Sequence, residues 1–526
     1  MNLPDLPDEI LFFILKKMNV VDTLYRQTGV HSRLDQLLFD HIYVRELDFT
    51  IKSWDDSIYP INDLVTDRIC KNILPHINNK ITKFILEPNA IERVLRIVNY
   101  PKLSSLSLMN FSKKKLIQYL TENSSLIKLM NEQITHLNVY IIDETDNDTD
   151  ELNLLELILS LSKCLIDFTF HQSSEFRNQN LSTTELSSTI CSTLTKLDIH
   201  LNTFDECLFL FDNRFPLLSH CSICIDKILL SSSSIDNKTK LLKLKYFSLT
   251  LCRGTNTYDD VIVPFLQRMV NLEELHLFLT VSRRDTFRIV DGNDLKQNIL
   301  IHLSQLKTFH FSIYTYLYQF INREPNNDDY SSNNDIQQSF IDTKLGQVGS
   351  YVHHSSSKNR YRCHVYSIPY KFKTFMRLSI SFTGGIFTNV RILAINDDVS
   401  WNYHFFHKVN QSFPFIETLM ICNSLPQEDK SLLNNNFEQF PIVTFNQLLN
   451  LHIYGLHIDY IQQLLFNQHT RLPCLGQLEI KYEELVELTN NFTNNPLQLN
   501  CLQVQNLIIN GCFVRPQNFS LFFPLL

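Results

Sequence analysis

Glycine is scarce in this sequence of 526 residues. Only ten glycines occur, and none belongs to a G-x-x-x-x-G-K-[ST], G-x-G-x-x-G or G-x-S-x-G motif. The common phosphate-binding loops and the nucleophile elbow of hydrolases are therefore absent. No cysteine is marked as the carrier of a transferred group either. We expect a protein that is not an enzyme and that needs no cofactor.

Long hydrophobic runs are also missing. The best candidate, residues 154–170, is interrupted by Glu156 and Lys163, so it is unsuited to cross a bilayer. The first residues, MNLPDLPDEI, carry early acidic side chains and no basic region, which predicts that no signal peptide is present. We therefore predict a cytoplasmic and/or nuclear protein without membrane contact.

An excess of positive charge is absent as well. The chain has 47 Lys and Arg against 55 Asp and Glu, a net charge of −8, and its basic residues form no stripe. Nucleic acid is therefore not expected as a partner, because its recognition depends on clustered positive charge.

Residue types that bind metals occur in isolated pairs. Cys221 and Cys224 form a C-x-x-C beside His220, but a zinc or redox site needs further ligands or a helix N-terminus, and neither lies nearby. The histidines within 353–354 and 404–407 also lack a matching second pair. We interpret Cys221 as a buried core residue and expect no metal site.

What the sequence does contain is a recurring phrase. Residues 194–202, LTKLDIHLN, fit L-x-x-L-x-L-x-x-[N/C], the pattern of a leucine-rich repeat. Leu197 and Ile199 are two residues apart, so on a strand they share one face, and Leu194 joins them from the preceding turn. A lone strand cannot bury these residues, whereas stacked copies form a continuous core.

Thirteen further segments match the phrase fully or in part. Their central apolar residues follow one another at intervals of 22 to 34 residues, except for one gap of 84 residues after Phe309. The fourteen central residues are Phe84, Leu106, Leu137, Phe168, Leu197, Cys221, Phe247, Leu275, Phe309, Leu393, Leu419, Leu451, Leu478 and Leu507.

The spacing predicts an α/β fold, a leucine-rich-repeat solenoid with a curved parallel sheet inside and helices outside. Repeats are expected at 46–321 and 371–526. Helical spacing follows several of the predicted strands, at 91–98, 152–161, 259–269, 294–303 and 460–466.

The gap between the two sets of repeats is read as an insertion, residues 322–370. Its polar start, 322–335, predicts a mobile loop, and residues 349–354 and 361–370 predict a hairpin around a turn at 355–359. The phrase beginning at Phe375 is either a degenerate repeat or is followed by a helix before Val390, and the sequence leaves both open.

Residues 1–45 do not follow the phrase and predict three short helices. The first runs from Pro7 to Met18, the second is capped by Asp22 and ended by Gly29, and the third covers residues 30–39. Residues 44–49 predict an unpaired strand. These three helices have a large apolar surface for so short a segment. This surface favours either a module that a partner covers or a cap that seals the first repeat.

The stretch LPDEILFFILKKMNVVDTLYRQTGVHSRLDQL, within residues 3–38, resembles an F-box, the helical motif of substrate-recognition subunits in cullin–RING ubiquitin ligases. Leu34 stands where that family usually has an aromatic residue. An F-box before leucine-rich repeats is the arrangement of a known class. The resemblance implies docking of a Skp-type adaptor, and through it a cullin–RING ligase, by Leu6, Pro7, Ile10, Leu11, Ile14, Leu15, Met18, Val21 and Leu24.

A protein target is expected on the solvent side of the strands. Strand alternation places histidine and aromatic side chains between the core positions, on the face that a solenoid leaves open. The candidate target-binding residues are Tyr246, His276, Phe278, His310 and His452. The sequence thus predicts a substrate-recognition adaptor for ubiquitination; the alternative is a leucine-rich-repeat scaffold with no ubiquitin role, whose N-terminal helices cap the solenoid.

Overall fold

The chain folds into two compact units. Unit 1 comprises Met1–Leu249 and Arg268–Glu273, and unit 2 comprises Thr250–Gln267 and Glu274–Leu526. The computed structural model describes residues 6–15, 17–52, 58–122, 125–142, 154–172, 191–201, 203–211, 214–225, 228, 240–251, 253–283, 288–318, 331–341, 343, 345–355, 360–428 and 441–526.

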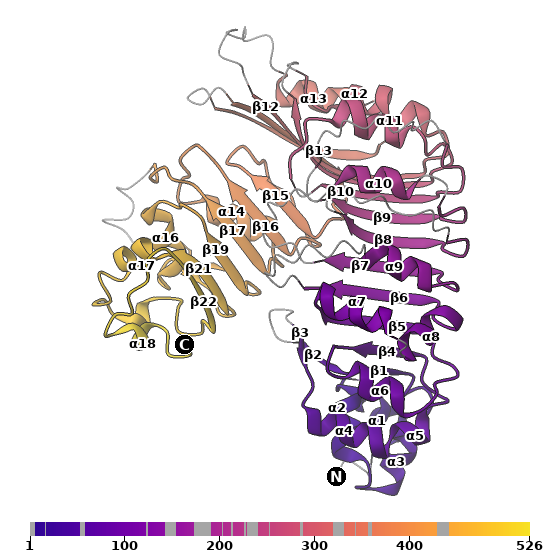
Figure 1. Ribbon diagram of the computed structural model, residues 1–526. Helices are drawn as coiled ribbons and strands as arrows, with labels where there is room; N and C mark the ends of the chain where they lie inside the picture. The colour runs from indigo at the N-terminus through magenta and orange to yellow at the C-terminus, as the bar shows by residue number, and fades with distance from the viewer. Residues whose placement is uncertain are drawn as a thin grey trace. The chain divides into compact units, whose positions relative to one another are not determined.

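The three N-terminal helices expected from the sequence are present, although their ends differ (Figure 1). Asn19, not Asp22, caps the second helix, because its side chain accepts a hydrogen bond from the Asp22 N–H. Asp22 instead lies in the first turn and pairs with Arg26 at 2.8 Å. Gly29 follows this helix with a φ of +85°, a conformation that glycine adopts easily. The helices are α1 (Asp8–Leu15), α2 (Val20–Gln27) and α3 (Ser32–Leu38).

Strand β1 (Glu46–Asp48) corrects one expectation. It was predicted to be unpaired, but it pairs in parallel with β4 (Lys83–Leu86), and Leu47 lies opposite Phe84. Both side chains are fully buried, so the pairing extends the core by one strand. Strands β2 (Thr50–Lys52) and β3 (Ile58–Pro60) form a separate antiparallel ribbon.

A large, mainly parallel sheet dominates the structure, with strand order β1-β4-β5-β6-β7-β8-β9-β10-β11-β12-β14-β13. In unit 1 the predicted central residues lie directly opposite one another, from Phe84 and Leu106 through to Leu197 and Cys221. All are buried, whereas the side chains that alternate with them are partly exposed, except for the buried Ser107. The strands are β5 (Ser105–Phe111), β6 (His136–Ile141), β7 (Asp167–Gln172), β8 (Lys196–Leu201), β9 (His220–Ile225) and β10 (Tyr246–Leu251).

Helices separate most of these strands in the sequence. They bury apolar side chains at helical spacing; for example, the helix at Lys113–Thr121 buries Leu116, Ile117 and Leu120. Helical structure occurs in all five segments where the sequence predicted it. In unit 1 the helices are α4 (Asp63–Asn72), α5 (Leu74–Ile77), α6 (Ile91–Ile97), α7 (Lys113–Thr121), α8 (Ser125–Glu132), α9 (Leu154–Leu161) and α10 (Phe204–Leu210).

Unit 2 begins its share of strands with two long parallel ones, β11 (Glu274–Arg283) and β12 (Thr308–Tyr318). Strand β12 then pairs antiparallel with β14 (Arg360–Ile368), which pairs antiparallel with β13 (Gln347–Ser355). The hairpin predicted within 349–370 is therefore confirmed; turn residues 356–359 lie outside the described residues.

The predicted polar loop at 322–335 needs correction at its end. Residues 322–330 lie outside the described part of the chain, but helix α13 (Asn333–Ser339) starts within the segment. Its N-terminus is a capping box, in which Ser332 and Asp335 each accept a hydrogen bond from the other's backbone N–H. A largely polar sequence therefore forms a helix here, with a capped first turn and with Ile336 and Phe340 buried.

The second sheet of unit 2 has the order β15-β16-β17-β19-β21-β22. Leu393, Leu419, Leu451, Leu478 and Leu507 lie opposite one another along it. The open question at residue 375 is resolved as a strand that pairs with β16, and residues 379–391 contain no helix. The strands are β15 (Thr374–Leu378), β16 (Ile392–Asn396), β17 (Thr418–Cys422), β19 (Asn450–Ile453), β21 (Gln477–Lys481) and β22 (Asn506–Asn510).

Shorter elements complete unit 2. Strands β18 (Val443–Thr444) and β20 (Thr470–Arg471) pair in parallel. Within the described residues, no helix is both long and apolar enough to cross a membrane. The helices are η2 (Tyr258–Ile262), α11 (Val263–Leu266), α12 (Gly292–Asn298), η3 (Leu300–His302), α14 (Phe405–Ser412), α16 (Ile458–Leu465), α17 (Tyr482–Leu488), η6 (Pro496–Gln498) and α18 (Phe519–Phe522).

His364 on β14 should make the stability of unit 2 depend on pH. Its ring nitrogens lie 2.9 Å from Ser312 Oγ and 3.2 Å from Tyr351 Oη, and burial lowers the pKa of His364 from 6.5 to about 3. Between these values the unfolded chain binds a proton that the folded chain does not, so stability falls as pH falls from about 6.5 to about 3.

We expect His364 to account for a loss of about 4 kcal/mol across this window. His364→Gln keeps hydrogen-bonding capacity but does not titrate, so its unfolding free energy should depend less on pH. Urea unfolding of both proteins at pH 7 and pH 4 measures the difference. An equal pH dependence in the two proteins would show that His364 does not carry this effect.

Candidate functional site

The structure divides the nine predicted adaptor-binding residues into two groups. Leu11, Leu15, Val21 and Leu24 are buried and hold the three N-terminal helices together. The other five are at least partly exposed to solvent: Leu6, Pro7, Ile10, Ile14 and Met18. The second group alone is available to a partner.

Helix α1 presents an apolar stripe to solvent, formed by Ile10, Phe13 and Ile14. Ile10 is 47% and Phe13 is 65% exposed, and Ile14 is intermediate. Phe13 was not predicted, although its spacing of three residues from Ile10 places it on the same helical face. Val30, also missed and 65% exposed, follows Gly29 just before α3. Isolated exposed apolar residues are normal, but a stripe of three on one short helix indicates a contact surface.

The N-terminal helices are fixed to the rest of unit 1. The guanidinium of Arg68 on α4 lies 5.0 Å from the centre of the Tyr25 ring, and Lys80 Nζ donates to the Phe39 carbonyl at 2.9 Å. Within the module, Arg33 pairs with Asp8 at 2.7 Å. The α1 stripe is therefore carried by a packed support and not by a loose terminal segment.

The burial pattern predicts unequal effects of two truncations. Leu24→Ala should lower the stability of the N-terminal module by about 2–5 kcal/mol, because it leaves a cavity in a closed core. Phe13→Ala should change stability by about 0.5 kcal/mol or less. Hydrogen exchange of residues 8–38 in urea reports the module separately from the remaining chain. Equal losses for both variants would contradict the division into core and surface.

A second candidate surface lies on the partly exposed face of β11 and β12 in unit 2. His276 and His310 are opposite each other in register, and their rings lie 5.0 Å apart in an edge-to-face arrangement. Phe372, which follows β14, lies 5.4 Å from Phe278 and 6.3 Å from His276, measured between ring centres. We call His276, Phe278, His310 and Phe372 the His276 cluster.

Polar contacts of the His276 cluster leave hydrogen-bonding capacity unused. His276 Nε2 lies 2.8 Å from Glu274 Oε1. His310 Nδ1 is buried and has no hydrogen-bond partner among the described residues. Burial lowers the pKa of His310, and the nearby His276 and Lys371 lower it further. A neutral imidazole beside two phenylalanine rings suits an apolar side chain with one polar group.

The other two predicted target-binding residues lie elsewhere. Tyr246, in unit 1, stacks on His220 with 5.9 Å between ring centres. His452, on β19 of the six-stranded sheet, lies 2.7 Å from Glu479 and stacks on Tyr454. Three of the five predicted residues thus meet in one cluster, and the sequence did not indicate Phe372 because that residue precedes β15 outside any repeat phrase.

Unit 1 carries a further aromatic and histidine group that the sequence reading missed. Tyr140 on β6 and His171 on β7 stack with ring centres 5.4 Å apart, and His171 Nε2 lies 3.3 Å from Asp198 on β8. The three residues come from successive strands. The alternation that identified His276 also predicts their shared face, so this signal was present in the sequence.

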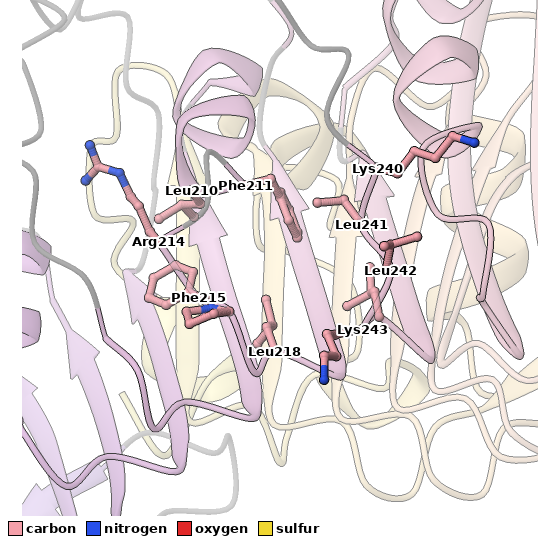
Figure 2. A pocket seen from close by; sticks show the side chains of 11 residues that line it. Leu210, Phe211, Arg214, Phe215, Leu218, Lys240, Leu241, Leu242 and Lys243 are labelled. Carbon is pink, nitrogen blue, oxygen red and sulfur yellow. The ribbon is translucent and has the colours of Figure 1, made fainter.

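A pocket of about 250 Å³ lies in unit 1 between the end of α10 and the start of β10 (Figure 2). Its lining is mainly apolar, and the charged ends of Arg214 and Lys240 point away from the apolar side chains. None of the predicted site residues lines it. The described lining residues offer mainly apolar contacts, which do not specify a ligand.

Cys221, considered as a metal ligand from the sequence, is a core residue. It lies opposite Leu197 on the neighbouring strand and is fully buried, and burial raises the pKa of its thiol well above its usual range. A thiol of this kind is protonated and inert. The interpretation of Cys221 as a small apolar core residue is confirmed.

Comparison with known proteins adds no family to this description: no protein-family model and no curated protein matches the chain. The structure itself defines an α/β protein built on a large sheet in which parallel strands predominate.

Proposed function

We propose that the chain is the substrate-recognition subunit of a cullin–RING ubiquitin ligase. In this proposal, residues 1–45 act as an F-box that binds a Skp-type adaptor, and leucine-rich repeats at 46–321 and 371–526 form a solenoid that binds a protein target. The observation that carries it is the α1 stripe, an exposed apolar helical face on a module that packs against the first strands of the parallel sheet.

The α1 stripe fits helix-to-helix docking. Ile10, Phe13 and Ile14 follow i, i+3, i+4 spacing, which an apolar groove or a facing helix accommodates. Burying the exposed parts of two such side chains contributes about 1 kcal/mol or more each. Truncation of a residue at the centre of such a contact commonly costs about 2 kcal/mol or more.

The sheet supplies what a recognition subunit needs, a surface with fixed spacing. The in-register rows of buried residues hold alternate side chains at the strand separation of about 4.8 Å. A target bound to such a surface is held at a defined distance from the transferring enzyme, and proximity then accelerates the transfer. The chain itself performs no chemistry in this proposal.

A second candidate function is a protein-binding scaffold whose N-terminal helices only cap the sheet. Contacts between the module and the start of the sheet favour it: Asn19 Nδ2 lies 3.4 Å from the backbone oxygens of Asp48 and Thr50. These contacts are compatible with both functions, whereas the exposed α1 stripe favours the first.

The first test is binding to a purified Skp-type adaptor. The full-length protein should form a one-to-one complex, and the double variant Ile10→Asp, Phe13→Asp should weaken binding at least about a hundredfold, since two charges would enter an apolar contact. Ile301→Asp is the matched control, because Ile301 is 64% exposed but lies on η3 of unit 2. Isothermal titration calorimetry measures all three.

Each outcome separates the two candidate functions. Binding that is lost in the double variant and kept in Ile301→Asp supports the adaptor function, provided circular dichroism shows folded proteins. A folded wild type that binds no adaptor leaves the cap function. Hydrogen exchange that is equally slow in residues 10–15 with and without adaptor would also support the cap.

The second test concerns the target. His276→Ala combined with Phe278→Ala should reduce capture of specific partner proteins at least about tenfold and leave adaptor binding unchanged, because the His276 cluster loses both polar and aromatic contacts. The matched comparison is His452→Ala with Tyr454→Ala, a histidine and aromatic pair on the other sheet. Quantitative mass spectrometry of crosslinked complexes compares the variants with wild type.

If only the variant with His276→Ala and Phe278→Ala loses capture of partner proteins, the target binds at the His276 cluster. If only the variant with His452→Ala and Tyr454→Ala loses capture, the target binds at the six-stranded sheet. Unchanged capture in both excludes the two clusters as the target site.

A further inference from the structure

Three side chains of metal-binding type meet in the interior of unit 2. His353 comes from β13, and Asp397 and Asp398 follow directly after β16. All three residues are more than nine-tenths buried. We infer that His353, Asp397 and Asp398 bind a divalent transition metal ion, Zn²⁺ first among them, which links the β13–β14 hairpin to the end of β16.

The distances between the ligand atoms suit a tetrahedral ion. His353 Nε2 lies 3.0 Å from Asp398 Oδ1 and 3.5 Å from Asp397 Oδ1, and one atom from each residue lies within 4.8 Å of the others. Ligands about 2.0–2.2 Å from zinc in tetrahedral geometry are separated by about 3.3–3.5 Å. Small side-chain rotations therefore suffice to place an ion among the three atoms.

The neighbourhood orients Asp397 toward the same point. Its Oδ2 accepts hydrogen bonds from the Ile380 backbone N–H at 2.7 Å and from Trp401 Nε1 at 3.1 Å. Its Oδ1 accepts from the Asp398 backbone N–H at 2.9 Å and faces His353. Groups that hold the non-ligating atom of a ligand are typical of metal sites, because they fix the ligating atom in place.

His353 and Asp398 are held in the same way. Ser381 Oγ lies 3.2 Å from His353 Nδ1, so that the imidazole can donate to the hydroxyl and direct the lone pair of Nε2 toward the carboxylates. Arg362, directly opposite His353 on β14, approaches Asp398 Oδ2 at 3.3 Å and leaves Oδ1 on the side of the histidine.

The charges also favour a cation. Arg362 offsets only one of the two buried carboxylates, and a divalent ion between their oxygens would offset the remaining negative charge. One nitrogen and two oxygen ligands suit Zn²⁺ better than Ca²⁺, which binds oxygen only. The sequence predicts no metal at 353–354, and it does not indicate that these side chains meet, because 45 residues separate His353 from Asp398. In the competing arrangement no metal is bound, and a protonated His353 forms ion pairs with Asp397 and Asp398.

Zn²⁺ and Co²⁺, added to metal-free full-length protein, are the probes. Calorimetry should show one Zn²⁺ per chain and a raised unfolding temperature. Bound Co²⁺ should give visible absorption without the thiolate charge-transfer band that a cysteine ligand adds. His353→Gln should abolish this binding, and Ser381→Ala should weaken it about tenfold to a hundredfold. His354→Gln, an exposed neighbour on the same strand, should bind as wild type does.

Several outcomes would overturn the inference. A folded wild type that binds neither ion shows that the cluster is an ion-pair network. Zinc binding that His353→Gln leaves unchanged, or cobalt spectra with a thiolate band, places the metal elsewhere. If His353→Gln does not fold, Ser381→Ala decides by the same titration, and unweakened binding in that variant counts against the site.

Discussion

The structure depends on the register of one row of buried side chains. Phe84, Leu106, Leu137, Phe168 and Leu197 lie opposite one another on successive parallel strands and are all buried. Each side chain packs against both neighbours, so a strand shifted by one residue would expose its apolar face. The same register fixes the positions of the alternate side chains. On β11 and β12 the pairing of Leu275 with Phe309 fixes the positions of His276 and His310 in the same way.

This dependence explains what the sequence could predict. Apolar residues that recur at intervals of 22 to 34 residues leave a periodic pattern in the sequence. This pattern correctly predicted that every central residue lies on a strand. Strand β1 was predicted but not its pairing, because Glu46 and Asp48 leave Leu47 as its single buried residue, too little to indicate a partner strand. Helix α13 was missed because polar residues dominate 322–335, although the Ser332-x-x-Asp335 spacing of its capping box is present in the sequence.

The candidate sites were less predictable because they combine residues that no local pattern connects. Alternation along β11 and β12 placed His276, Phe278 and His310 on one face, and the structure bears that out. Phe372 joins them from a segment between two strands, where its position depends on the tertiary fold. On α1, helical spacing predicts an apolar stripe but not which of its members α2 and α3 cover. Leu11 and Leu15 face inward while Phe13 faces solvent, a division that only packing decides.

Polar residues in the interior of unit 2 show the same limit most clearly. His353 and Arg362 are cross-strand neighbours in the β13–β14 hairpin, and both reach Asp398 beyond the end of β16. Such a cluster is favourable only when every member has its hydrogen-bond or ion-pair partner, because a buried charge without a partner costs several kcal/mol. The antiparallel ladder between β12 and β14 sets the register of the hairpin on the large sheet. The contacts of His353 and Arg362 with Asp398 then link the hairpin to the end of β16, and they act beside the aromatic packing of Tyr366 on Phe375.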